Sequence, residues 1–121
     1  MKKILLIDDE RDVCYFLKWH LEETGNYKVF SCSDSAKAVS ETEAVQPDLI
    51  LLDLRMPGLS GEEIAEQLSV NPKTCEIPVI FLTATSEEER LIKGDGAKKA
   101  RGSITKPIAV EELVRVIASV L

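Results

Sequence analysis

The sequence lacks the features that mark membrane-spanning and secreted proteins. None of its apolar runs is long enough to cross a bilayer, and the first run stops at two aspartates instead of leading to a signal-peptide cleavage site. Cysteine and histidine are scarce, with three and one in 121 residues, and no Cys-x-x-Cys pair occurs. We therefore expect a cytoplasmic protein with reduced thiols and no disulfide or zinc framework. The cysteines are Cys14, Cys32 and Cys75.

Basic charge is also in short supply. The chain has 15 Lys and Arg against 21 Asp and Glu, for a net charge of −6, and its only basic cluster is Lys98, Lys99 and Arg101. Direct binding to nucleic acid needs a basic face that neutralises phosphates, so the composition argues against that function. The cluster is interpreted as a solvated helix end. We expect neither nucleic acid nor a membrane as a direct partner.

What the sequence does contain is enough apolar residues for one core. With 121 residues and 45% hydrophobic side chains, and no repeat or linker, it predicts a single domain over residues 1–121. Four apolar runs end in polar side chains, and if the runs are parallel strands, these ends meet at one edge of a sheet. The runs and their ends are 3–7 with Asp8 and Asp9, 49–52 with Asp53, 78–82 with Thr83, and 103–105 with Lys106.

Between these runs the apolar spacing becomes helical. Residues 13, 16, 17, 20 and 21 predict an amphipathic helix over 11–24, whose buried face includes Phe16 and His20. A second strand is expected at 27–31. Further helices are expected from Ser33 or Asp34 to just before Pro47, and over 61–70, 86–101 and 110–120.

Five strands that alternate with five helices predict an α/β fold with a parallel sheet covered on both faces by right-handed crossovers. The pattern alone does not fix the strand order. In the order 2-1-3-4-5, the switch point lies between the strands that end at Asp8 and Asp53, and the carboxylates would meet there.

The chemistry of such a cluster follows from its charge. Three ionised carboxylates held together need a compensating cation, and Mg²⁺ suits oxygen ligands that share it with water and a phosphoryl group. Asp53 would then be a nucleophile that forms an aspartyl phosphate. Lys106 and the Thr83 hydroxyl would each contact a phosphoryl oxygen. Taken singly, each residue has a purely structural explanation, such as an N-cap, a turn or a solvated cation.

The pairs Asp8-Asp9, Thr83-Ala84 and Lys106-Pro107, together with Asp53 and residues 54–58, resemble a response-regulator receiver domain from end to end. The resemblance implies a flavodoxin-like (βα)5 sandwich with the order 2-1-3-4-5. It further implies that Asp9, Asp53 and the backbone carbonyl of Arg55 contact Mg²⁺ directly, that Asp8 acts through water, and that a cis peptide bond precedes Pro107. The implied phosphodonor is a sensor histidine kinase or phosphotransfer protein, and the implied target is a downstream protein or a fused effector domain.

Two departures and two alternatives stand beside this resemblance. Ser103 replaces the aromatic residue that receivers commonly place before the Lys-Pro pair, and Gly94 and Gly96 weaken the expected fourth helix.

One alternative is an Mg²⁺-dependent phosphohydrolase with an aspartate nucleophile, but that family has a second acid where Arg55 stands. The other is a flavodoxin-like cofactor binder, yet no glycine-rich or hydroxyl-rich phosphate loop follows the first strand. We expect self-catalysed phosphorylation and dephosphorylation of Asp53, not turnover as an enzyme.

Overall fold

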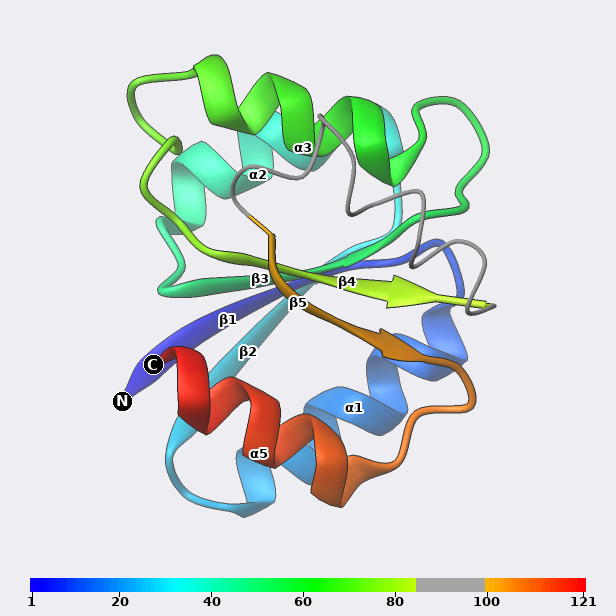
Figure 1. The fold of residues 1–121 in the computed structure, drawn as a ribbon, viewed down its shortest axis with the longest axis vertical. Coiled ribbons are helices and arrows are strands. Elements are labelled where there is room, and N and C mark those ends of the chain that lie inside the picture. The colour runs from blue at the N-terminus through cyan, green and yellow to red at the C-terminus, as the bar shows by residue number, and fades with distance from the viewer. Residues whose placement is uncertain (85–99) are drawn as a thin grey trace.

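The computed structural model describes residues 1–84 and 100–121 of the chain. Five parallel strands form one sheet in the order β2-β1-β3-β4-β5 (Figure 1), which confirms the α/β class and the strand order implied by the resemblance. The strands are β1 (Lys2–Ile7), β2 (Tyr27–Cys32), β3 (Leu49–Asp53), β4 (Val79–Thr83) and β5 (Ala100–Thr105).

Helices cover both faces of this sheet. In Figure 1, α1 and α5 lie on one face, and α2 and α3 lie on the other. Their bounds are α1 (Arg11–Glu23), α2 (Ala38–Val45, preceded by the 3-10 turn η1, Ser35–Lys37), α3 (Gly61–Val70) and α5 (Val110–Val120). No helix within the described ranges is long and apolar enough to cross a membrane.

The helix expected over 86–101 lies outside the described residues except at its end. There the prediction is wrong, because Ala100 and Arg101 begin strand β5. Strand β5 is therefore longer than the short apolar run suggested. Its first residue pairs with Val79, and the register with β4 then shifts by a residue before Gly102 pairs with Ile80.

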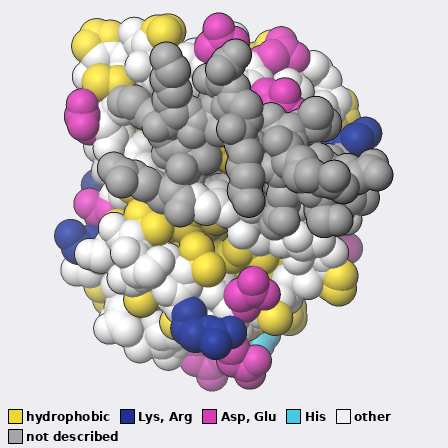
Figure 2. Space-filling model, viewed as in Figure 1, with side chains coloured by type: hydrophobic (Ala, Val, Ile, Leu, Met, Phe, Trp, Pro, Cys, Tyr) yellow, Lys and Arg dark blue, Asp and Glu magenta, His cyan; other side chains and the backbone are white. Residues whose placement is uncertain are grey.

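The core is split by the sheet into two layers. Alternate side chains of the central strands point to opposite faces, so Leu6 and Leu51 pack on the side of α1 and α5, whereas Leu5 and Leu52 pack on the side of α2 and α3. All four are fully buried. Continuous burial of the central strands explains why their sequences are uninterrupted apolar runs. Figure 2 shows hydrophobic side chains reaching the surface between the β5 edge and α5, with charges of both signs around them.

Helix α1 has nearly the predicted bounds, and its buried face includes Leu17 and Leu21 as predicted but is shifted toward Cys14 and away from Phe16. Its buried residues are Cys14, Leu17 and Leu21, whereas Phe16 is 46% exposed and His20 is only partly buried. The prediction of a buried Phe16 is therefore wrong. The small Cys14 thiol fits against the sheet, where it donates a hydrogen bond to the Asp8 carbonyl oxygen at 3.4 Å. The buried stripe thus runs through Cys14, Leu17 and Leu21, and Phe16 contacts the His20 ring outside it.

Candidate functional site

Three acids meet at the carboxyl edge of the sheet. Strands β1 and β3 are neighbours, and Ile7 pairs with Leu52, so the residues that follow each of them emerge side by side. Asp8 is fully buried, Asp53 is 5% exposed, and Asp9 is exposed. One carboxylate oxygen from each lies within 4.8 Å of the others. The cluster thus has a buried floor, formed by Asp8 and Asp53, and an open rim at Asp9.

Lys106 supplies the cation of this cluster. It follows β5 directly, and its backbone N–H donates to the Thr83 carbonyl oxygen at 2.6 Å, which ties the end of β5 to the end of β4. The Nζ atom lies 3.1 Å from Asp8 Oδ2 and 3.6 Å from Asp53 Oδ1, and the side chain is 20% exposed. The peptide bond between Lys106 and Pro107 is cis. The ammonium therefore lies against both buried carboxylates.

The charges at this edge do not balance. Among the described residues, the three carboxylates of Asp8, Asp9 and Asp53 have one ammonium beside them, that of Lys106, so a net negative charge remains, and Asp8 and Asp53 are buried. The donor atoms are all oxygens, which a hard divalent cation such as Mg²⁺ prefers over softer metals. A cation with two charges would neutralise what Lys106 leaves over. The residues present therefore fit the cofactor that the sequence predicts.

Burial and neighbouring charge perturb the titration of two groups. Burial, and after it the nearby Asp8 carboxylate, together raise the pKa of Asp53 to about 6, against the opposing effect of Lys106. Burial alone would lower the pKa of Lys106, but the carboxylates around its ammonium outweigh that effect, and the pKa is raised. At neutral pH the pair is therefore a largely ionised carboxylate beside a charged ammonium.

Thr83 and Arg55 flank Asp53. Thr83 ends β4 one position beyond Leu82, which pairs with Asp53, and its buried hydroxyl donates to Thr105 Oγ1 at 3.5 Å. The Arg55 backbone N–H donates to Asp53 Oδ1 at 3.3 Å. The predicted contacts of the Thr83 hydroxyl with a phosphoryl oxygen, and of the Arg55 carbonyl with a metal, remain predictions.

The turn after Asp53 is fixed by a glycine that the sequence analysis did not single out. A Cβ atom on Gly61 would collide with the Asp53 carbonyl oxygen and lie 2.8 Å from Leu54 Cα. Gly61 begins α3 behind a capping box, in which the Ser60 side chain accepts from the Glu63 N–H and Glu63 accepts from the Ser60 N–H. The Gly61 N–H also donates to the Leu54 carbonyl oxygen at 3.0 Å. Helix α3 therefore packs directly on the backbone that carries Asp53.

Glu10 is the other residue that the sequence analysis missed. Its Oε1 atom lies 3.3 Å from Lys106 Nζ, although its own side chain is 59% exposed. The only signal in the sequence is that Glu10 extends the acid pair Asp8-Asp9 by one residue. Nothing in that run shows that the third acid turns back toward a lysine at the far end of the chain.

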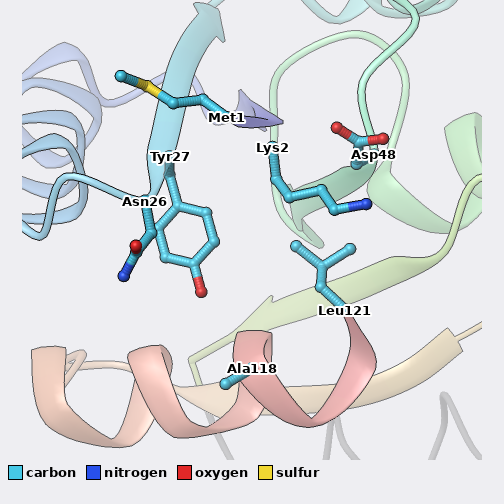
Figure 3. Close-up of a pocket in the computed structure, with 7 residues that line it drawn as sticks. All are labelled: Met1, Lys2, Asn26, Tyr27, Asp48, Ala118 and Leu121. Carbon is cyan, nitrogen blue, oxygen red and sulfur yellow. The ribbon is translucent and has the colours of Figure 1, made fainter.

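A hollow of about 680 Å³ lies at the opposite, amino-terminal edge of the sheet (Figure 3). Both ends of the chain contribute to its lining, with Met1 and Lys2 on one side and Leu121 on the other. Its charged groups are Lys2 and Asp48, and Asp48 Oδ2 already accepts from the Lys3 N–H at 2.7 Å. The three clustered carboxylates and Lys106 lie at the other edge, which makes that edge the candidate site.

The comparisons with known proteins identify the family of this chain. A sequence profile described as the response regulator receiver domain matches residues 4–118. Protein PilH of Pseudomonas aeruginosa is 34% identical over 100% of this chain and 98% of its own length. The phosphate regulon transcriptional regulatory protein PhoB of the same species is 38% identical over 99% of this chain and 52% of its own length. The chain thus spans about half the length of PhoB and nearly all of PilH.

Solved structures show the same fold. The chemotaxis response regulator CheY4 of Vibrio cholerae superimposes with a TM-score of 0.89 at 26% identity, over 100% of this chain and 99% of that one. The response regulator TrrA of Thermotoga maritima, in complex with Mg²⁺-BeF, gives 0.85 at 30% identity over 100% of both chains. The fold and the acid cluster define a receiver-type signalling module. The chain belongs to the response regulator receiver domain family of two-component systems.

Proposed function

We propose that this domain accepts a phosphoryl group on Asp53 from a sensor histidine kinase or a phosphotransfer protein, in a reaction that requires Mg²⁺. The observation that carries the proposal is the placement of the Lys106 ammonium against Asp8 and Asp53, at 3.1 and 3.6 Å. A nucleophile, its neighbouring acids and a phosphoryl-binding cation thereby share one edge of the sheet. Membership of the receiver family supports the same role.

The chemistry expected of Asp53 is a displacement at phosphorus. A carboxylate oxygen attacks the phosphorus atom while the bond from phosphorus to the donor's imidazole nitrogen breaks, and that nitrogen keeps the electron pair and then takes up a proton. With a pKa of about 6, Asp53 is largely ionised at neutral pH and can act without a separate base. The Lys106 ammonium would stabilise the negative charge on the phosphoryl oxygens, because it already lies beside the attacking carboxylate of Asp53.

Asp8, Asp9 and Asp53 would hold the divalent cation, with the Arg55 carbonyl as a further ligand. When bound, Mg²⁺ supplies positive charge that offsets the phosphoryl oxygens. The structure of TrrA in complex with Mg²⁺-BeF supports Mg²⁺ as the cation. The carboxylate of Asp8 is held in place by two contacts, since Oδ1 accepts from the Glu10 N–H at 3.0 Å and Oδ2 accepts from Lys106 at 3.1 Å.

The same chemistry limits the catalysis that we expect. The domain would catalyse its own phosphorylation on Asp53 and the slow hydrolysis of the resulting aspartyl phosphate. It would turn over no separate substrate. The site offers no support for the phosphohydrolase alternative, because Arg55 stands where that family has its second acid, and Arg55 is exposed.

The phosphodonor is expected to approach over the first turns of α1, because transfer in line requires its histidine to come close to Asp53. Arg11 is exposed there, and Tyr15 is 75% exposed. Cys14 lies on the same turns of α1 but is only 5% exposed and packs against the sheet, so it offers little surface to a partner. Phe16 and Trp19, at 46% and 56% exposure, extend the apolar surface along the helix. The downstream target would be a separate protein or a fused effector domain.

We also infer a single domain over residues 1–121 and a cytoplasmic location. One sheet joins both halves of the described chain, and the family profile covers residues 4–118. The three cysteines are free thiols, which suits a reducing compartment.

Intact-mass spectrometry after incubation with acetyl phosphate tests the proposal without the natural donor. We expect one added phosphoryl group on the wild-type protein with Mg²⁺, and none with EDTA or in Asp53→Asn. A matched variant, Asp48→Asn, removes an acid at the opposite edge of the sheet and should still be labelled. Equal labelling of Asp53→Asn would overturn the proposal.

A further inference from the structure

Lys106 also forms an ion pair with Glu10, an acid that lies outside the metal cluster. Its Nζ atom is 3.3 Å from Glu10 Oε1, which is closer than its 3.6 Å approach to Asp53 Oδ1. Among the carboxylates of residues 1–84 and 100–121, only Asp8 Oδ2, at 3.1 Å, is nearer. The ammonium therefore makes its two shortest contacts with Asp8 and Glu10, and the proposed nucleophile comes third.

The backbone at Glu10 is held on both sides. Its N–H donates to Asp8 Oδ1 at 3.0 Å, and its carbonyl oxygen accepts from the Cys14 N–H at 3.1 Å as the first turn of α1 forms. Glu10 is the N-cap residue of α1, but its side chain makes no capping hydrogen bond to that helix. The side chain instead accepts a hydrogen bond from Lys106, whose backbone follows the edge strand β5.

An ammonium has three protons, and Lys106 faces three carboxylates. A phosphoryl group on Asp53 would bring further acceptor oxygens, so one existing contact has to give way. Glu10 is the one that can leave at least cost, because its side chain is 59% exposed and water can replace the lysine, whereas the Asp8 side chain is 1% exposed.

We propose that Glu10 is a positioning residue that holds Lys106 in the unphosphorylated domain and releases it when the phosphoryl group arrives. The inference rests on the proposed phosphorylation of Asp53. The ion pair between Glu10 and Lys106 stabilises the unphosphorylated domain and is lost on transfer. Because it must be broken as the phosphoryl group arrives, the Glu10 carboxylate slows phosphoryl uptake. The exchange also changes a contact at the start of α1, so the beginning of this helix is coupled to the state of the site.

The matched variants are Glu10→Gln and Asp12→Asn. Each removes one negative charge near the start of α1, and Asp12 is an exposed acid of the first turn that is not among the acids paired with Lys106. With acetyl phosphate and Mg²⁺ in excess, we expect Glu10→Gln to be phosphorylated about two to five times faster than the wild type, as befits loss of a partly exposed ion pair. Asp12→Asn reports the effect of charge alone and should stay close to the wild-type rate.

NMR of protein carrying ¹³C-labelled glutamate carboxyl groups gives a readout that does not depend on the rate. The Glu10 signal is identified by its absence in Glu10→Gln. We expect this signal to move when Mg²⁺ and beryllofluoride are added to the wild type, and to move in the same direction in Lys106→Ala without any addition. A Glu10 signal that does not move, or equal rates for Glu10→Gln and Asp12→Asn, would overturn the inference. A wild-type protein that takes up no phosphoryl group would instead overturn the proposed function, and this inference with it.

Discussion

The Lys106 ammonium lies 3.1 Å from Asp8 Oδ2, although the two residues are 98 positions apart in the chain. The sheet order places β3 and β4 between the strands that precede them, so the lysine side chain spans the polar edge to reach β1. The Asp8 side chain is 1% exposed and that of Lys106 is 20% exposed. A buried pair of this kind leaves an uncompensated charge when either partner is removed.

Removal of Lys106 should therefore strengthen metal binding. In Lys106→Ala, the carboxylates of Asp8 and Asp53 lose the cation that competes with Mg²⁺, and we expect the Mg²⁺ dissociation constant to fall about tenfold, or by about 1.4 kcal/mol. Calorimetric titration at pH 8 measures this change. Lys28→Ala is a suitable control, because Lys28 pairs with Glu22 on another part of the molecule. An unchanged or weaker Mg²⁺ affinity in Lys106→Ala would contradict the competition.

Asp53 should make the metal-free fold less stable as the pH rises. Its pKa is about 6 in the folded chain and 3.8 when unperturbed, so the folded state binds the proton more tightly, and ionisation costs it stability above pH 4. Asp53→Asn removes that cost. We expect the variant to be about 1–3 kcal/mol more stable than the wild type at pH 7.5 in EDTA, with the difference shrinking as the pH falls toward 4.

Urea unfolding of both proteins across this pH range measures the difference, and saturating Mg²⁺ provides the control. Mg²⁺ should stabilise the wild type more than Asp53→Asn, because the variant lacks one carboxylate of the cluster. A stability difference that is independent of pH would show that the Asp53 carboxylate does not carry this cost.

Gly61 should be required for the geometry of Asp53. In Gly61→Ala, the new methyl group meets the Asp53 carbonyl oxygen and the Leu54 backbone, which have no room to move without shifting β3 or α3. We expect a loss of about 1–3 kcal/mol in the free energy of unfolding and slower phosphorylation by acetyl phosphate. Gly102→Ala is the matched control, since the described part of the chain offers its methyl group no contact tighter than Val116 Cγ1, at 3.7 Å. Equal effects of the two substitutions would rule out the close approach as the cause.

The sequence predicts the sheet well because its signals are local. The run that precedes Asp53 is apolar at every position, and β3 is buried at every position. The bounds of α3 and α5 match the helices expected over 61–70 and 110–120, since each segment carries its own apolar spacing, and Ser60 caps the start of α3. The polar ends of the strands then converge because parallel strands share one carboxyl edge.

What the sequence misses depends on contacts between distant elements. Phe16 has the right helical spacing for burial, but the stripe of α1 that faces the sheet is decided by how Cys14 and Leu17 pack against it. The Glu10 contact with Lys106 joins residues 96 positions apart. Gly61 looks like any residue at a helix start until the backbone of Asp53 is placed beside it.

The most direct test of the phosphorylation of Asp53 is to locate the phosphoryl group on the chain. The wild-type protein is incubated with acetyl phosphate and Mg²⁺, the acyl phosphate is reduced with borohydride, and the peptides are analysed by tandem mass spectrometry. We predict that residue 53 is converted to homoserine, and that Asp8, Asp9 and Glu10 stay unmodified. Conversion of any other acid in place of Asp53, or of none in fully folded protein, would contradict the assignment of Asp53 as the phosphoacceptor.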